Sequence, residues 1–169
     1  RTMFTKILAA VDGSEHAGKA VAIAGSLAGR YDADLVVVHV VTGDEVPDEL
    51  RRMAEVEHLV EPRSAEPARL GSLSVAPAAT VDEARLAAAV GARVLERAVA
   101  AAKREGAQRV TSLELSGDAA DALLGAAQEH GADLVVVGRR GFGALGSLVM
   151  GSVSGKLAHH LEVPCLTVK

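Results

Sequence analysis

The stretch that decides the fold is residues 131–154, which read GADLVVVGRRGFGALGSLVMGSVS. Its first part contains Leu134–Val137, a short apolar run without polar alternation, as expected of a strand that is covered on both faces. A glycine-rich segment follows at once, and we expect a helix to begin near Ser152. The stretch therefore predicts a strand, a loop and a helix in direct succession.

The same succession recurs along the chain. Four further Val- and Leu-rich runs read as strands, and Ala-rich segments with helical end signals lie between them. Because crossovers between parallel strands are right-handed, this order predicts an α/β fold: an open, doubly wound, five-stranded parallel sheet with helices on both faces. The other expected strands are Ile7–Val11, Leu35–Val41, Arg109–Leu115 and Cys165–Val168, and the expected helices are Ser14–Arg30, Thr80–Gly106, Asp118–Gly131 and a last one from Ser152 that ends before Val163-Pro164.

Local chemistry marks the ends of these helices. Ser14 can act as an N-cap by accepting a hydrogen bond from a backbone N–H of the first turn. Thr80 and Glu83 have the spacing of a capping box, and Gly106 suits the end of the same helix because glycine adopts the left-handed conformation. The last helix must end before Pro164, since the residue that precedes a proline avoids helical geometry.

Residues 44–79 interrupt this rhythm. They hold four of the five prolines and are expected to form a flexible insert within a single domain that spans residues 1–169. The part Asp48–Val60 predicts a short amphipathic helix, and Ser64–Ala79 has the Ser, Pro and Ala content of a linker. The insert is either a lid over a site or a tolerated surface excursion. The expected apolar side of its helix consists of Leu50, Met53, Val56 and Leu59 or Val60.

Composition excludes several classes of function. The chain has 169 residues, a formal net charge of -4 and 2% aromatic residues. A sequence-independent nucleic-acid binder needs a surplus of Lys and Arg, and aromatic platforms for the bases, so we expect no nucleic-acid partner. No apolar run reaches the roughly 18–20 residues that span a bilayer, and the N-terminus shows no signal-peptide core. Cys165 is the single cysteine, which fits a reducing compartment, and we expect a cytoplasmic protein without a membrane partner.

The glycine-rich segment has the parts of a phosphate site. In open α/β sheets, ligands bind beyond the carboxyl ends of the strands, where this segment begins. Glycines let backbone N–H groups approach an anion and adopt positive φ, and the amino end of the next helix favours negative charge. The hydroxyls of Ser152 and Ser154 and the guanidinium of Arg139 or Arg140 can add hydrogen bonds. The alternative is a flexible glycine loop in which Ser152 only caps the next helix.

Two other phosphate motifs fit less well. Gly141, Gly143 and Gly146 match the bare dinucleotide fingerprint, but they follow the fourth strand rather than the first, and no acidic residue ends the next strand. A Walker A loop needs four residues between its glycines. Residues 151–157, GSVSGKL, have three, and a leucine stands where the magnesium-binding hydroxyl should be.

The full glycine spacing is Gly138-x2-Gly141-x9-Gly151-Ser152. This spacing resembles the ATP-binding signature of the universal stress protein family, whose fold is of the adenine nucleotide alpha hydrolase type. The resemblance covers nearly the whole chain, and so long an ungapped spacing is improbable by chance. Further segments that look like this family are Val11–Ser14, Leu35–Val40, 131–138 and Val163–Val168.

The resemblance implies a site for ATP, with Mg²⁺ or Mn²⁺. In ATP-binding members the aspartate after the first strand reaches the ribose and phosphates; here it is Asp12, which is also the expected metal contact. The backbone near the end of the second strand, here that of Val40, meets the adenine edge. The glycine loop wraps the phosphates, and the helix start closes over them. The nucleotide contacts that the resemblance implies are Ala10, Val11, Asp12, Val40, Val137, Gly138, Arg140, Gly141, Gly143, Gly151, Ser152, Val153 and Ser154.

Three functions remain open. The first is an ATP-binding universal stress protein, a nucleotide-dependent regulatory module in the stress response. The second is an enzyme, at most a slow ATPase or a nucleotidyl-transferring relative, because the sequence offers arginines and Asp12 but no evident base. The third is a dimeric assembly domain that binds no nucleotide. The strand Cys165–Val168 is expected at a sheet edge, where pairing would produce a homodimer.

The remaining titratable candidates have simpler explanations. His39 lies among valines in a predicted strand and is expected to be a buried histidine with a backbone partner. His159 and His160 are adjacent on a helix, so they point about 100° apart and cannot share one metal ion. Cys165 is expected to be a small core residue, since nothing near it in sequence would lower its pKa.

Overall fold

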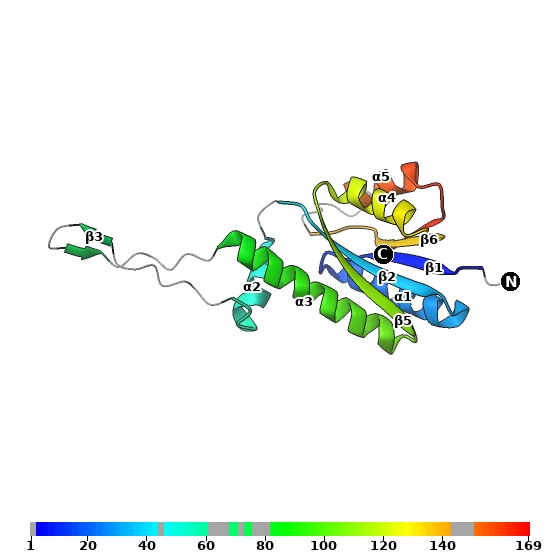
Figure 1. Cartoon of the computed structure of the whole chain (residues 1–169), viewed down its shortest axis with the longest axis horizontal. Helices are drawn as coiled ribbons and strands as arrows, with labels where there is room; N and C mark the ends of the chain where they lie inside the picture. The colour runs from blue at the N-terminus through cyan, green and yellow to red at the C-terminus, as the bar shows by residue number, and fades with distance from the viewer. Residues whose placement is uncertain (1–2, 44–45, 61–67, 71–72, 76–81, 143–150) are drawn as a thin grey trace. The chain divides into compact units, whose positions relative to one another are not determined.

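A five-stranded parallel sheet organises the larger of two compact units in the chain. The structure is a computed structural model that describes residues 3–43, 46–60, 68–70, 73–75, 82–142 and 151–169. The larger unit comprises Arg1–Asp44 and Gly91–Lys169, and the smaller unit comprises Glu45–Val90. Figure 1 traces the chain from the N-terminus to the C-terminus.

The strand order of the sheet is β5-β2-β1-β6-β7, and every pair is parallel. The predicted five-stranded, doubly wound α/β fold is therefore confirmed, and the C-terminal strand lies at an edge as expected. Strand order reverses between the first strand and its neighbour β6, which defines the switch point of the sheet. The strands are β1 (Lys6–Ala10), β2 (Asp34–Val41), β5 (Arg109–Ser116), β6 (Leu134–Gly138) and β7 (Cys165–Val168).

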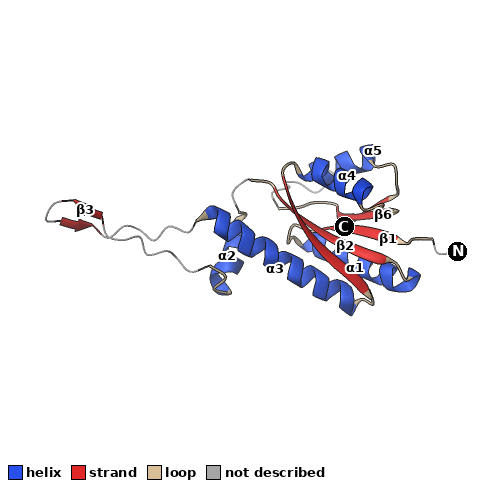
Figure 2. Cartoon of the chain, in the orientation of Figure 1, coloured by secondary structure: helices blue, strands red, loops and turns tan. Residues whose placement is uncertain are grey.

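Helices cover both faces of the sheet (Figure 2). One core cluster joins β1, β2 and β6 to α4 (Ala119–Glu129) and α5 (Ser152–His160). The opposite face packs against α1 (Glu15–Tyr31), whose buried side is almost entirely alanine. In the described part of the chain, no helix combines the length and the apolar character needed to cross a bilayer. The cluster under α4 and α5 consists of Leu8, Val36, Val38, Leu123, Ala126, Ala127, Ala132, Val135, Val137 and Leu157.

Two glycines bring α1 against α3 (Glu83–Arg104) at van der Waals distance between backbones. A Cβ on Gly25 would lie 2.6 Å from the carbonyl oxygen of Ala102, and a Cβ on Gly29 would lie 2.6 Å from that of Gly106. Real Cβ atoms do not approach this closely, so only glycine permits the contact. The two helices are thereby fixed to one another over the final turns of each.

The predicted helix-end roles of Ser14 and Gly106 are confirmed. Ser14 is the N-cap of α1 and accepts a hydrogen bond from Ala17 N at 3.3 Å. Asp118 caps α4 by accepting from Ala120 N and Asp121 N. Gly106 follows α3 with a φ of 111°, as a residue in the left-handed region should. The predicted cap Thr80 lies outside the described residues.

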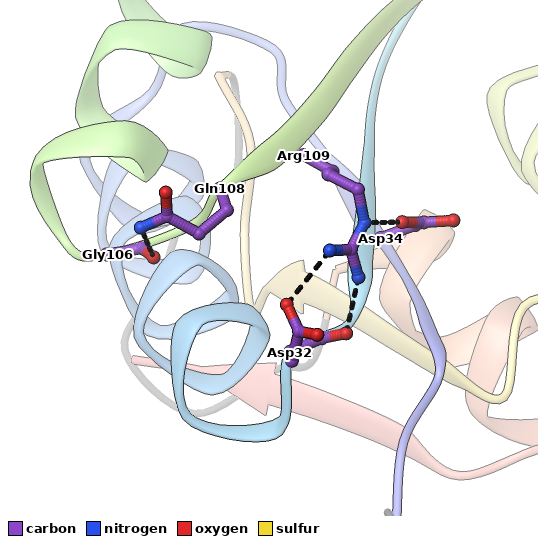
Figure 3. Close-up of polar contacts among 5 residues, drawn as sticks. All are labelled: Asp32, Asp34, Gly106, Gln108 and Arg109. Carbon is purple, nitrogen blue, oxygen red and sulfur yellow. Dashed lines mark hydrogen bonds and ion pairs between the residues drawn. The ribbon is translucent and has the colours of Figure 1, made fainter.

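Polar contacts tie the amino ends of the strands together at the edge opposite the glycine segment. Arg109 at the start of β5 binds the carboxylate of Asp34 through Nε at 2.5 Å and that of Asp32 through Nη1 at 2.9 Å (Figure 3). Asp32 ends α1 in the left-handed conformation, with a φ of 53°. These exposed ion pairs hold the first turn after α1 against β5, and local sequence patterns gave no sign of them.

The smaller unit corrects two predictions. Its helix α2 (Asp48–Val56) ends four residues earlier than expected, and His58 two residues on has a φ of 53°, which no helix accommodates. Val56, which was expected on the apolar side of this helix, is 78% exposed, whereas Leu50 and Ala54 are buried. The predicted apolar side was therefore only partly correct. The linker prediction was incomplete, because β3 (Ala68–Leu70) and β4 (Leu73–Val75) pair antiparallel. The rest of 64–79 lies outside the described residues.

Candidate functional site

The candidate site lies where β1 and β6 end side by side at the switch point. β1 leads into Asp12, and β6 leads into Arg139 and Arg140. Ligands of open α/β sheets bind in this crevice because diverging loops open it beyond the carboxyl ends of the strands. The described site residues that the sequence predicts come from β1, β2 and β6, from the loops that follow β1 and β6, and from the start of α5.

Asp12 is held beside the amino end of α1. Its Oδ1 accepts a hydrogen bond from Ser14 N at 2.9 Å. The simpler explanation of Asp12, that it caps α1 itself, is wrong, because Ser14 is the N-cap. The loop after β6 passes directly over this carboxylate: a Cβ on Gly141 would overlap Asp12 Oδ2. The structure thus brings Asp12 and Gly141 into contact, although 129 positions separate them in the sequence.

Ser14 links the same two loops. Its hydroxyl donates to the carbonyl oxygen of Arg140 at 3.4 Å while it accepts from Ala17 N. The side chain is buried, so both sides of the hydroxyl are occupied by backbone. The guanidinium of Arg140 is different: its Nε is buried and has no hydrogen-bond partner among the described residues. A buried donor of this kind is costly unless a ligand supplies an acceptor.

The described glycines of the segment are needed for close packing against neighbouring residues rather than for unusual backbone angles. A Cβ on Gly138 would lie 2.8 Å from Ala17 N and from the carbonyl carbon of His16. None of Gly138, Gly141 and Gly151 has positive φ. The expectation of positive φ in these three is therefore wrong, since they are glycine because the loop packs against α1 and Asp12. Gly143 lies outside the described residues.

Gly151 brings the start of α5 against the loop after β6. Its N–H donates to the carbonyl oxygen of Arg139 at 3.0 Å. The hydroxyl of Ser154 donates to the same oxygen at 3.0 Å and to Gly151 O at 3.1 Å. Ser154 is 2% exposed, so its hydroxyl serves the backbone and is not presented to a ligand.

The amino end of α5 has no capping side chain. Gly151 occupies the N-cap position, and Ser152 is the first helical residue. The alternative in which Ser152 caps the helix is therefore wrong. The first N–H groups of a helix have no acceptor within the helix and carry its positive dipole end. Ser152 is exposed and Val153 half-buried at this end, beside Arg139 and Arg140.

The end of β2 presents backbone groups beyond the end of β1. Val11 N donates to Val38 O at 2.8 Å, whereas Val41 O accepts from Gly117 N after β5. Since alternate residues of a strand point their N–H and C=O to opposite sides, the groups of Val40 face the space past the last β1 hydrogen bond. Ala10, Val40 and Val153 are partly buried against the core, and Val11 and Val137 are buried.

His39 behaves as predicted and has a role that the sequence did not reveal. It is buried, and its Nδ1 lies 2.9 Å from Val11 O. A carbonyl oxygen can only accept, so Nδ1 carries the proton. The bond holds the residue that precedes Asp12. The other edge of the His39 ring lies against Gly91, the residue at which the larger unit's part of α3 begins. A Cβ on Gly91 would lie 3.0 Å from His39 Cδ2.

The remaining titratable residues lie away from this crevice. Half-burial raises the pKa of the Cys165 thiol, which agrees with the expectation of an unreactive side chain. His159 and His160 are exposed at the end of α5. Among the described residues, no three His, Cys, Asp or Glu side chains gather as a metal site would require. Asp12 is the one carboxylate in the described loop residues 11–14 and 139–142 that follow β1 and β6.

Comparisons with known proteins identify the family of the chain. A sequence profile of the universal stress protein family matches residues 3–169. The Thermus aquaticus protein named "Universal stress protein in QAH/OAS sulfhydrylase 3'region" is 36% identical over 167 residues, which cover 99% of this chain and 100% of that protein. The chain therefore belongs to the universal stress protein family.

Solved structures share the fold. A universal stress protein in complex with cAMP aligns with a TM-score of 0.62 at 21% identity, covering 98% of this chain and 96% of that chain. The Archaeoglobus fulgidus universal stress protein in complex with dAMP aligns with a TM-score of 0.60 at 22% identity, covering 99% of each chain. Both complexes contain an adenine nucleotide.

Proposed function

We propose that the chain binds ATP at the carboxyl ends of β1 and β6 and acts as a nucleotide-dependent regulatory module in a cytoplasmic stress response. One observation carries the proposal: Gly151 leaves the amino end of α5 uncapped and donates to Arg139 O, and a Cβ on Gly151 would lie 3.5 Å from the Cα of Arg140, whose buried Nε has no partner among the described residues. Two kinds of anion-seeking donor thus stand together. The nucleotide complexes of structural relatives support an adenine nucleotide as the anion.

The phosphates would bind the start of α5. The N–H groups of Ser152 and Val153 lie in its first turn, where the helix offers them no acceptor. The hydroxyl of Ser152 is exposed and can donate a further bond. Arg140 supplies the charge-assisted contact, and Gly141 lets the loop lie against Asp12 without a side chain between them.

The base would bind at the end of β2. The N–H and C=O of Val40 face past the end of β1, and an adenine edge offers a matching donor and acceptor. Ala10 packs partly buried against the same core cluster as Val40 and Val137, so apolar atoms border this position. The arrangement would read the base edge through backbone groups, while packing holds the ring.

A divalent cation, Mg²⁺ or Mn²⁺, fits this site as part of the bound nucleotide. Mg²⁺ is usually held by one or two carboxylates together with substrate phosphates and water. Asp12 supplies one carboxylate, of which Oδ1 is engaged by Ser14 N. The cation would neutralise phosphate charge, and Asp12 would orient it.

The site favours binding over turnover. Efficient phosphoryl transfer needs a residue that orients the attacking water, in addition to cations and a metal. Among the described residues at the switch point, Asp12 is the only carboxylate, and Ser14 N already engages one of its oxygens. A slow ATPase or a nucleotidyl-transferring activity is the second candidate. An assembly domain that binds no nucleotide is the third.

We also propose that the chain forms a homodimer through β7. This strand lies at the sheet edge, and Leu166 on it is 37% exposed. An edge strand with exposed apolar side chains is stabilised by pairing with a second copy. Dimerisation would place the two nucleotide sites in one assembly, because Arg139 N donates to Val168 O at the end of the same strand.

A charge at the start of α5 tests nucleotide binding. Ser152→Asp places a carboxylate beside the phosphates, and Ser152→Asn is a matched control of equal shape without charge. A unit charge about 5 Å from another costs about 3 kcal/mol at an effective dielectric constant of 20. Solvent and salt reduce this cost, so we expect Ser152→Asp to weaken ATP binding about tenfold in isothermal titration with Mg²⁺.

The possible results separate the three functions. Equal ATP affinity of Ser152→Asp and Ser152→Asn would contradict the proposed phosphate position. No heat from the wild-type chain at millimolar ATP would favour the assembly domain. Phosphate release that disappears in Asp12→Asn would favour the ATPase. The helix itself should not suffer, because a carboxylate in the first turn interacts favourably with the helix dipole.

A further inference from the structure

A cavity lies between α1 and the part of α3 that follows Gly91, and none of the residues that the proposed function assigns to the phosphates, the cation or the base lines it. Its volume is about 410 Å³, within the range of small-molecule sites. Buried side chains form its apolar floor, and exposed residues form its rim. The floor residues are Val11, Ala17, Val21, Val94 and Ala98, and the rim residues are Gly13, Gly18, Arg97, Ala100 and Arg104.

Glycines explain why the cavity is open. At the far ends of the two helices, Gly25 and Gly29 bring their backbones into contact with Ala102 and Gly106. That contact fixes the spacing of the helices. Towards the start of α1 the side chains are too small to fill the remaining space, and a Cβ on Gly18 would meet nothing within 4 Å. The cavity is therefore preformed and does not depend on a ligand to open it.

The rim is cationic. Arg97 and Arg104 line the cavity seven residues apart, which places them on the same face of α3. None of the described residues that line it is acidic. Arg104 makes no ion pair with any residue that the structure describes. An apolar floor under a cationic rim is complementary to a molecule with one apolar part and one anionic end.

We propose that this cavity binds a medium-chain fatty acid. The hydrocarbon chain lies on the floor between α1 and α3, and the carboxylate bonds to Arg104 at the rim. Val11 and Gly13 line the cavity and flank Asp12, so the ligand contacts both neighbours of the residue assigned to the nucleotide. The binding itself does not depend on the proposed nucleotide function.

Nuclear magnetic resonance on the ¹⁵N-labelled full chain tests this assignment. Decanoate is titrated below its micelle concentration, with decanol and decyltrimethylammonium as probes that share the chain but lack the carboxylate. We expect decanoate to shift amide signals of residues 13–21 and 94–104. We expect both control probes to bind more weakly.

Three variants complete the test. Gly18→Leu fills the open space and should abolish the shifts, whereas Gly125→Leu, at an equally open helical glycine, should leave them unchanged. Arg104→Gln should weaken decanoate binding about fivefold, as expected of one exposed ion pair. Circular dichroism of all three shows whether the fold is retained.

Several results would overturn the proposal. These are equal binding of decanol and decanoate, shifts that fall outside the two helices, or full binding by Gly18→Leu. Shifts of the same residues with protein concentration alone would assign the surface to a second copy of the chain and also overturn it.

Discussion

The glycine contact between α1 and α3 yields a quantitative prediction about stability. In Gly25→Ala the new Cβ would lie 2.6 Å from the carbonyl oxygen of Ala102, whereas ordinary contacts begin at 3.4 Å, so the helices must separate by about 0.8 Å. The opposing atoms are backbone and cannot rotate away. We therefore take the upper part of the range for overpacking, about 3 kcal/mol.

Helix propensity acts in the opposite direction. Alanine is favoured over glycine inside a helix by about 1 kcal/mol, so the net loss in the free energy of unfolding is about 2 kcal/mol. Gly125→Ala in α4 is the matched control, because a Cβ there meets nothing within 4 Å. That variant should gain up to about 1 kcal/mol from propensity alone.

Differential scanning calorimetry measures the difference directly. For a chain of this length, 1 kcal/mol shifts Tm by about 2–4 °C. Gly25→Ala should therefore melt about 4–8 °C below the wild type, and Gly125→Ala up to about 4 °C above it. If Gly25→Ala melts with or above Gly125→Ala, the two helices do not meet backbone to backbone, and the cavity between them loses its structural basis.

Three further predictions concern residues at the ends and edges of the sheet. Partial burial acts to raise the pKa of Asp133, but hydrogen bonds from Thr5 and the Lys6 N–H hold it below its ordinary value. The stability from this carboxylate is present above about pH 4 and is lost as pH falls through the lowered pKa. Chemical denaturation from pH 6 to pH 2 should therefore show a smaller acid loss in Asp133→Asn than in the wild type. Arg109→Ala should lower Tm by more than Lys19→Ala does, because Arg109 pairs with both Asp32 and Asp34 whereas Lys19 makes one exposed helix pair; equal melting of the two would contradict a stabilising role for the ion pairs of Figure 3. Leu166→Glu should convert the proposed dimer into a monomer in sedimentation analysis, and an unchanged mass would place the interface elsewhere.

Local patterns in the sequence were sufficient for the order of elements and for the helix caps. The strands were recognisable because β1, β2 and β6 are covered on both faces and therefore lack polar alternation. β5, with the sequence RVTSLELS, does mix polar with apolar residues, and it is largely exposed because it forms the edge beside β2. Whether a strand is exposed at an edge depends on its position in the sheet, and the amino-acid sequence of one strand does not specify that position.

The reason for each glycine could not be read locally. Gly138 and Gly141 are glycines because His16, Ala17 and Asp12 lie against them, and those residues come from the other end of the chain. The sequence analysis placed the glycines in the correct loop but attributed them to anion approach and positive φ, and it did not foresee their packing against α1 and Asp12. Likewise, the Ser154 hydroxyl counts as a phosphate donor in the sequence pattern, whereas its burial against Arg139 O commits it to the loop.

The difference in length between neighbouring strands is what opens the site. β1 ends at Ala10, while β2 continues beside β5 as far as Val41. Had β1 continued with its partner, its backbone would have saturated Val40, and the end of β2 would offer nothing to a base. The bond from His39 Nδ1 to Val11 O holds β1 at its point of departure, so that Asp12 turns towards Gly141 and α5. A histidine within a valine strand is thus consistent with a structural role, because it secures the turn on which the whole crevice depends.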